Sequence, residues 1–159
     1  MIARLARNRS GAAAAEFVLL LPLMLLLLFG GFEAGHFFWT QHKIVKSVRD
    51  GARFASRLDI GRLCAGDATL LAEIRNVTAT GQLVGGTAKV PGWAPGNVSV
   101  AVSCNSFVDT GIYTDLGTRG PLVTVSSGPV RYPSLFATLG FIDNTIDLSA
   151  RSSAAVVGL

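Results

Sequence analysis

The sequence predicts an α+β protein in which one long N-terminal helix packs on a small antiparallel sheet. The chain has 159 residues, the length of one domain, and half of them are apolar while only 15% are charged. In soluble domains about a quarter of the residues are charged, so the low charge of this chain indicates that some segment is strongly apolar. Residues 17–32 form such a run. Apolar and polar residues alternate after residue 97, as in half-buried strands. The high apolar content excludes a disordered chain.

The charge of the chain is divided unevenly along its length. The net charge is +4; residues 1–57 hold eight basic and three acidic residues, and residues 58–159 hold six basic and seven acidic residues. The positive charge therefore flanks the apolar run, as in membrane-anchored proteins. A nucleic-acid-binding domain would show a separate basic face with interleaved aromatic residues, so we expect no nucleic acid partner.

Residues 12–32 are long enough to cross a membrane as a helix. The uncharged run 17–32 alone would be about 24 Å long, short of a hydrocarbon core of about 30 Å, whereas residues 12–32 reach about 31 Å. A signal peptidase needs small residues at the first and third positions before its cut, and no candidate cut at the end of the run offers both. The segment is therefore predicted to be retained as a membrane anchor in contact with lipid.

The distances of the flanking basic residues from the span decide its predicted orientation, because equal numbers of basic residues lie on its two sides. Three basic residues precede the span and three follow it within about 20 residues, the range that sets topology: Arg4, Arg7, Arg9, Lys43, Lys46 and Arg49. Arg9 is close to the span, whereas Lys43 lies well beyond it. Residues 37–39 (FFW) stand where an aromatic belt would meet the far interface. We therefore expect a single pass through a bacterial inner membrane, a cytoplasmic N-terminus and a periplasmic C-terminal domain.

Glu16 lies inside the predicted span, near its N-terminal end. A carboxylate at that depth costs a few kcal/mol and by default indicates a function; the alternative is an interfacial side chain that reaches the lipid headgroups. Residues 7–17 (RNRSGAAAAEF) are a basic leader, Gly11, four alanines from Ala12, then Glu16 and Phe17.

This arrangement resembles the TadE-like pseudopilins of the bacterial tight-adherence (Flp-type) pilus system. The resemblance runs from about residue 7 to 55 and includes the signal at 11–17, the Leu/Phe-rich span with Pro22, residues 32–35 (FEAG) and residues 49–55 (RDGARFA). It implies that a membrane-embedded prepilin peptidase cuts the Gly11–Ala12 bond, so that Glu16 and Phe17 become the fifth and sixth residues of the mature protein. It also implies a pilin-like layout and two kinds of protein partner, other pilins or pseudopilins and inner-membrane pilus assembly proteins.

The chemistry of these residues agrees with that processing. Gly11 has no Cβ and fits a crowded cleft in an extended conformation, while the basic leader would hold the bond at the anionic cytoplasmic surface. Cleavage would expose an amine on Ala12 at membrane depth. In pilin-like assemblies the residue corresponding to Glu16 is thought to pair with the N-terminus of a neighbouring subunit, which would select the register between subunits more than it adds stability.

The span is predicted to continue as one helix through residues 33–60, ending near Gly61. Gly31 and Gly35 match the small-xxx-small spacing that lets two helices approach closely; the alternative is a bend where the helix leaves the bilayer. A stripe of apolar residues with helical spacing continues beyond the membrane, and we expect the chain's own C-terminal domain to cover part of it and partner subunits the rest. The stripe consists of Phe37, Ile44, Val45, Val48, Ala52, Ala55 and Leu58.

Residues 61–159 are predicted to form the small α+β head. Asp67 would cap a helix that closes at Gly81, and a Gly/Pro-rich connection follows at 85–96. Strands are expected at 98–104, 122–127 and 145–157, with a loop at 105–120 and a short helical turn from Tyr132 to Gly140. Antiparallel pairing of the strands would give a sheet packed on the long helix. The predicted division is thus a leader (1–11), a transmembrane helix (12–32), its periplasmic extension (33–60) and the head.

The two cysteines, Cys64 and Cys104, are predicted to form a disulfide if the head is periplasmic; two buried thiols are the alternative. We expect no metal, since neither Cys-x-x-Cys nor histidines at suitable spacing occur, and His36 and His42 fall on different helix faces. No nucleophile elbow, phosphate-binding loop or dinucleotide glycine pattern is present. The sequence therefore predicts no enzyme, no cofactor and no small-molecule substrate.

The predicted function is that of a minor pseudopilin, a structural subunit processed by the prepilin peptidase and involved in pilus initiation or assembly. The alternative is an uncleaved, membrane-anchored periplasmic protein that binds a partner through residues 58–159. That alternative predicts an intact N-terminal leader and a dispensable Glu16. A tethered hydrolase would need a nucleophile–base pair that the sequence does not reveal.

Overall fold

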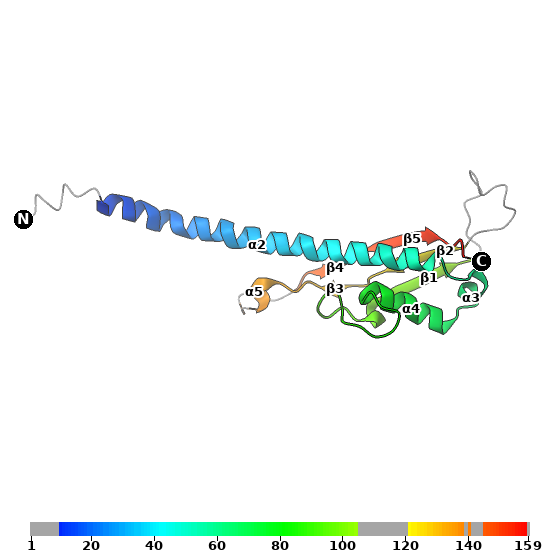
Figure 1. Ribbon diagram of the computed structural model, residues 1–159. Helices are drawn as coiled ribbons and strands as arrows, with labels where there is room; N and C mark the ends of the chain where they lie inside the picture. Colours follow the sequence, from blue (N-terminus) through cyan, green and yellow to red (C-terminus); the bar gives the residue numbers. More distant parts are fainter. Residues whose placement is uncertain (1–9, 105–120, 139, 141–144, 159) are drawn as a thin grey trace, which may run out of the picture.

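The computed structural model describes residues 10–104, 121–138, 140 and 145–158, and Figure 1 shows one very long helix with a small head along its C-terminal half. The predicted loop at 105–120 and residue 139 of the predicted turn lie outside the described residues. The elements in chain order are α2 (Ser10–Ala55), α3 (Ile60–Cys64), α4 (Ala68–Ala79), the 3-10 turn η1 (Pro95–Asn97), β1 (Ser99–Ser103), β2 (Leu122–Ser126), β3 (Val130–Arg131), α5 (Leu135–Thr138), β4 (Asp147–Leu148) and β5 (Arg151–Ala155).

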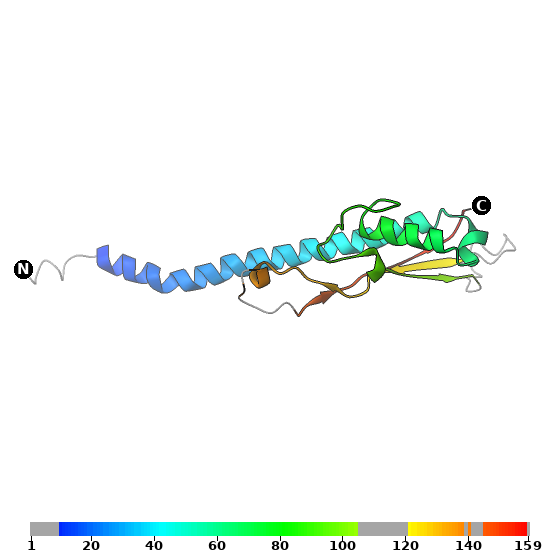
Figure 2. The same ribbon diagram turned by 90° about the horizontal axis from the view of Figure 1, so that it is seen from below.

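The fold class is confirmed as α+β with antiparallel sheets. The main sheet has the order β1-β2-β5, and β3 pairs with β4 in a second, two-stranded sheet. The register of the main sheet sets Val100 opposite Val125, and Thr124 opposite Ser153. The C-terminal half of α2 contacts β2, β5 and α4, so the helix lies across the sheet with α4 beside it (Figure 2).

The core forms where the apolar stripe of α2 meets the sheet. Ile44, Val48, Ala52 and Ala55 are at most 1% exposed, and their spacing of three or four residues places them on one helix face. They join one cluster with residues of α4, β2 and β5 and with the fully buried Trp93, whose Nε1 donates to the carbonyl of Ser127 at 3.2 Å. The head therefore covers this part of the stripe, as predicted.

The end of α2 differs from the prediction. The helix ends at Ala55, not near residues 60–61, and is followed by a tight turn and the separate helix α3. The tail of the chain after β5 accounts for the early end: the Val157 N–H donates to the Ser56 carbonyl at 2.8 Å, and Gly158 lies so close that a Cβ would overlap the Leu58 carbonyl. The carbonyl that would have continued the helix is thus bonded to the tail of the chain.

The last strand also differs from the prediction. The expected strand 145–157 is divided into β4 and β5, and β3, which was not predicted, pairs with β4. The break follows from Gly128 and Pro129 on the neighbouring strand, because Gly128 adopts φ 65° and proline has no N–H to donate. The Ser127 side chain bridges the gap, accepting from the Ala150 N–H at 2.9 Å.

The predicted cap of α4 is confirmed. The Asp67 carboxylate accepts from the N–H groups of Thr69 at 2.9 Å and Leu70 at 3.4 Å, and Arg62 Nη2 donates to its other oxygen at 2.7 Å. The Arg62 hydrogen bond, followed by that from Thr69, holds the pKa of the Asp67 carboxyl below its ordinary value of 3.8. The Asp67 charge therefore stabilises the junction between α3 and α4.

We expect this contribution to disappear in acid. Because the pKa of Asp67 is lower in the folded state than in the unfolded one, its stabilisation is complete above pH 3.8 and is lost as the pH falls through the folded value. Asp67→Ala should lower the melting temperature at pH 7, while Asp67→Asn, which keeps a capping oxygen, should lower it less. Melting curves from pH 7 to pH 2.5 should show wild type and Asp67→Asn converging; a constant difference would contradict the assignment.

Candidate functional site

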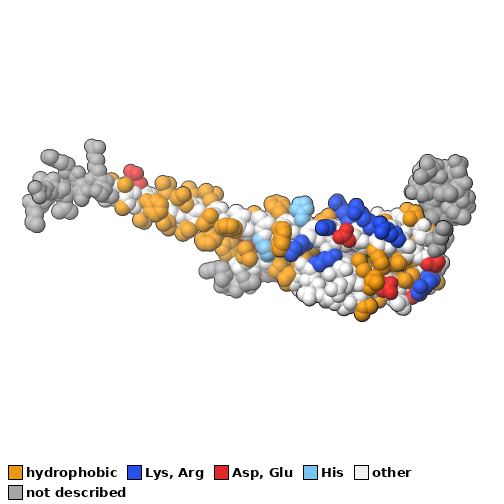
Figure 3. Space-filling view, viewed as in Figure 1, with side chains coloured by type: hydrophobic (Ala, Val, Ile, Leu, Met, Phe, Trp, Pro, Cys, Tyr) orange, Lys and Arg blue, Asp and Glu red, His pale blue; other side chains and the backbone are white. Residues whose placement is uncertain are grey.

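The N-terminal half of α2 is an exposed apolar rod. The helix from Gly11 to Ala55 is long and apolar enough to cross a membrane, and none of its most apolar 18-residue window is buried within the chain. Every residue from 11 to 32 is exposed, and Figure 3 shows hydrophobic side chains along the rod. An unburied apolar helix of this length is compatible with a single-pass membrane anchor.

The residues of the predicted processing signal lie in the first turns of this rod. Gly11 is the second residue of α2, followed by Ala12, and Glu16 and Phe17 lie one turn further on, all exposed. Among the described residues, no hydrogen bond or ion pair contacts Glu16. The Glu16 carboxylate is thus available to another molecule.

Gly31 and Gly35 lie on an open face of α2. A Cβ at either position would meet nothing within 4 Å, whereas Glu33, His36 and Phe37, between and after them, are partly covered. The helix also continues unbroken through Pro22. The two glycines therefore leave a flat strip along which a second helix backbone could approach closely.

Just after the apolar run, the helix is joined to the head by a polar cluster that the sequence analysis missed. Tyr132, 2% exposed, donates its hydroxyl proton to the Glu33 carbonyl at 3.1 Å, and its oxygen lies 3.0 Å from His36 Nδ1. The ring of Tyr132 also packs edge-on against Phe37, with centroids 5.3 Å apart. Burial, then the charge of Glu33, raises the pKa of Tyr132 to about 12, so the hydroxyl stays protonated and remains a donor.

The Glu33 side chain extends this cluster to α5. Its Oε2 accepts from the Leu135 N–H at 3.1 Å, and its Oε1 is buried without a hydrogen-bond partner among the described residues. One turn earlier on α2, Phe29 packs edge-on against Phe136 with ring centroids 6.2 Å apart. The first acidic residue after the apolar run could have indicated a contact, but its partner lies about a hundred residues away in sequence.

A row of basic side chains occupies the part of α2 that the head leaves open. Lys46, Arg49 and Arg53, and Arg57 just after the end of the helix, are all exposed, and Figure 3 shows a band of Lys and Arg side chains beside the head. Lys43 lies against the ring of Trp39, 3.5 Å from its centroid. The C-terminal half of α2 therefore has an apolar face toward the head and a basic face toward solvent.

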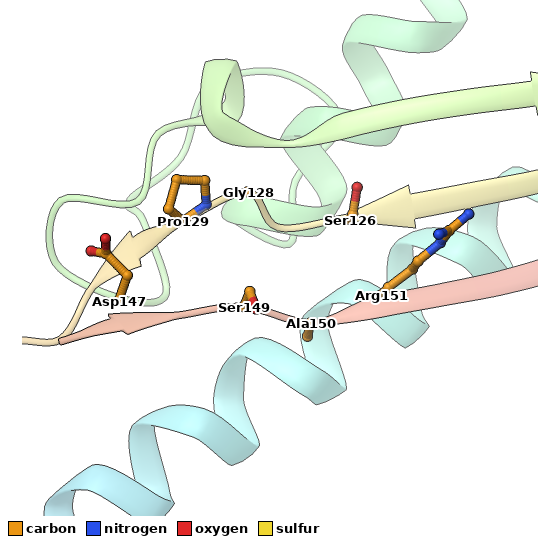
Figure 4. A pocket seen from close by; sticks show the side chains of 7 residues that line it. All are labelled: Ser126, Gly128, Pro129, Asp147, Ser149, Ala150 and Arg151. Carbon is orange, nitrogen blue, oxygen red and sulfur yellow. The ribbon is translucent and has the colours of Figure 1, made fainter.

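An open hollow lies where the two sheets diverge, and its charged residues do not converge. Its volume is about 550 Å³, and it is lined by Ser126, Gly128, Pro129, Asp147, Ser149, Ala150 and Arg151. Figure 4 shows Asp147 and Arg151 at opposite ends of the hollow, and Asp147 pairs instead with Arg131 at 3.4 Å. In the part of the chain that the structure describes, no three His, Cys, Asp or Glu residues gather as metal ligands.

Cys64 and Cys104 are joined in a disulfide, as predicted, with Cα atoms 5.9 Å apart. The bond ties the end of α3 to the end of β1. Disulfides persist mainly in oxidising compartments such as the periplasm. Helix α3, which ends with Cys64, lies at the end of the head farthest from the apolar rod (Figure 1).

Comparison with known proteins identifies the N-terminal helix and not the head. Residues 11–53 match the family model described as TadE-like protein, which confirms the resemblance drawn from the sequence. The match begins at Gly11 and ends two residues before the end of α2. No curated protein and no solved structure matches the chain.

Proposed function

We propose that this chain, which carries a TadE-like segment of a Tad pilus-associated family, is a minor pseudopilin. It would be made as a precursor in the inner membrane with a cytoplasmic N-terminus, cut at Gly11–Ala12 by a prepilin peptidase, and drawn into a Flp-type pilus assembly, where it helps initiation. It would act as a structural subunit and not as an enzyme. The observation that carries the proposal is the exposed apolar rod that starts with Gly11 and places Glu16 within its first turns.

The geometry at Gly11 supports cleavage there. The first N–H groups of a helix have no partner within it, so the first turn frays at little cost, and glycine lowers helix stability further. A peptidase could therefore pull residues 10–12 into an extended strand without disturbing the head, whose ring contact with α2 at Phe29 lies far along the helix from Gly11.

The position of Glu16 supports docking to a sister subunit. Cleavage leaves a positive amine on Ala12, and Glu16, four residues further on, has no partner among the described residues. In low dielectric, opposite charges attract strongly and an unpaired charge is penalised. Two subunits would then prefer the axial offset that brings the amine of one to the Glu16 carboxylate of the other.

Processing is tested by the intact mass of the full chain extracted from membranes of cells with and without the peptidase. We expect protein from peptidase-containing cells to begin at Ala12, and Gly11→Val to remain uncut because a branched side chain crowds the cleft. Gly30→Val is the matched control: neither glycine has a neighbour within 4 Å, yet only Gly11 borders the predicted bond. Wild-type protein that keeps residues 1–11 in the presence of the peptidase would support an uncleaved, membrane-anchored binding protein instead.

Assembly is expected to depend on the charge of Glu16. Glu16→Leu should leave the head folded and the precursor processed, but reduce incorporation into pilus-associated complexes at least about tenfold, since loss of one partner leaves a membrane-buried amine unpaired. Glu16→Gln should behave similarly, and Leu19→Ala, a change at an exposed neighbour, should have little effect. Incorporation is measured by cross-linking in intact cells; normal incorporation of Glu16→Leu would contradict the pairing.

A further inference from the structure

The helix α5 lies apart from the main body of the head, beside the apolar rod. Strands β3 and β4 carry the chain away from the three-stranded sheet, and α5 at their tip reaches further toward the N-terminal end of α2 than the rest of the described head (Figures 1 and 2). Contacts among the described residues hold it there, including Phe136 against Phe29, the Leu135 N–H on the Glu33 carboxylate, and Tyr132 on the Glu33 carbonyl.

These contacts fix the depth of α5 relative to the predicted membrane span. Phe29 lies three residues inside the end of the span at Phe32, about 4.5 Å along the helix axis, and Glu33 is the first charged residue beyond it. A group held against Phe29 and Glu33 therefore lies at the boundary between acyl chains and headgroups. Segments that lie in this zone bury their apolar side chains about 5–10 Å deep.

The surface around α5 continues the apolar surface of the rod. Leu135 is 43% exposed, and on α2 Phe29 is 48% and Phe32 62% exposed. Phe and Leu side chains are typical of the apolar face of segments that lie in a membrane interface. The same bilayer that surrounds the rod would reach this surface without any further apolar partner.

Three backbone N–H groups around the start of α5 have acceptors within the chain, which suits a membrane boundary, where unpaired N–H groups are costly. The Ser134 N–H donates to the Tyr132 carbonyl at 2.9 Å, and Pro133 has no N–H. The Leu135 N–H donates to Glu33 at 3.1 Å, and the Ala137 N–H to the Ser134 hydroxyl at 3.1 Å. These three donors therefore need no water molecule as a partner.

We propose that residues 132–138 form a second membrane contact, inserted at the acyl–headgroup boundary of the leaflet on the side of the head. The occupant of this surface is lipid, and the inference rests on the membrane anchoring in the proposed function. One helix crossing the bilayer would leave the head free to rotate about the helix axis, whereas a second contact point fixes which side of the head faces the membrane.

The test uses the full chain in phosphatidylethanolamine–phosphatidylglycerol vesicles with a fluorescent label on a single introduced cysteine. Both natural cysteines are in the disulfide, so the new thiol is labelled selectively. Leu135→Cys is compared with Leu25→Cys in the span and with Val84→Cys, which is 81% exposed on the head. We expect lipids carrying a quencher near the headgroup to quench the label at 135 at least twofold more than the label at 84. A quencher deep in the acyl chain should favour the label at 25 over that at 135.

The outcomes separate this inference from the proposed function. If the label at 25 is quenched and that at 135 resembles that at 84, the anchor stands and the second contact is wrong. If neither is quenched, the anchoring itself is contradicted. A label at 135 that is shielded from lipid and cross-links to a second copy would assign this surface to a neighbouring subunit and overturn the inference.

A second pair of variants checks that position 135 is held by Glu33. In the Leu135→Cys background, Glu33→Leu should reduce shallow quenching at least twofold, because the Leu135 N–H loses its acceptor. Glu33→Gln keeps an acceptor oxygen and should preserve the quenching. Equal quenching in all three proteins would show that the Leu135–Glu33 hydrogen bond does not hold α5 at this depth, and would overturn that part of the proposal.

Discussion

Replacing Cys64 and Cys104 together by alanine is expected to lower the free energy of unfolding by roughly 4 kcal/mol, because the bond closes a loop of 40 residues and restricts the unfolded chain. Cys64 is exposed and Cys104 half-buried, so the truncation removes little packing. The melting temperature should fall by about 15 °C or more. The measurement is thermal unfolding of the full chain in detergent micelles, followed by near-ultraviolet circular dichroism.

Reduction supplies the control for this prediction. The wild-type protein in excess reductant should melt at the same temperature as the double variant, and the double variant should not respond to reductant. If the double variant melts like the oxidised wild type, the loop is already restrained by other contacts, and the disulfide contributes little to stability.

Gly51→Ala is expected to destabilise the head by about 2 kcal/mol, although alanine is the better helix former. Gly51 is buried where α2 crosses α4, and a Cβ there would overlap the Thr78 hydroxyl. Thr78 is fully buried and donates to the Ile74 carbonyl at 2.7 Å, so it has little room to move. Overpacking of this kind costs about 1–3 kcal/mol, more than the roughly 1 kcal/mol that helix propensity returns.

A double-mutant cycle isolates this contact. Thr78→Ala removes the hydroxyl that the new methyl would strike, so Gly51→Ala should cost much less in that background. Gly35→Ala is the control on the open side of the same helix, where a Cβ meets nothing within 4 Å. Urea unfolding of the four proteins gives the coupling; equal costs of Gly51→Ala in both backgrounds would contradict the close approach of α2 and α4.

Patterns among residues close together in sequence predicted the buried face of α2, the strand β1 and the cap of α4. The spacing of Ile44, Val48 and Ala52 fixes which face of α2 is buried, because a helix repeats every 3.6 residues. The alternation around Val100 in the same way identifies β1, with partly buried valines between exposed small residues. Asp67 was predictable as a cap because Asp is a preferred N-cap residue, and its carboxylate accepts from the N–H groups two and three residues on.

The remaining features depend on residues far apart in sequence, and no local pattern could reveal them. α2 ends at Ala55 because the tail at Val157 bonds to Ser56, a contact across about a hundred residues. The division of the last strand follows from Gly128 and Pro129 on its neighbour. In the candidate site, the signal around Gly11 and Glu16 was visible because it is contiguous, whereas the pairing of Glu33 with Tyr132 and Leu135 required the fold.

The unbroken course of α2 also has a mechanical consequence. The rod that begins at Gly11 and the core stripe from Ile44 to Ala55 belong to one helix, with no linker between them to act as a joint. A pull or twist applied at the N-terminal end would therefore be transmitted along one continuous helix into the centre of the head. Any machine that draws this helix out of a bilayer would therefore move the head together with it, and a rotation of the helix about its axis would rotate the head by the same angle.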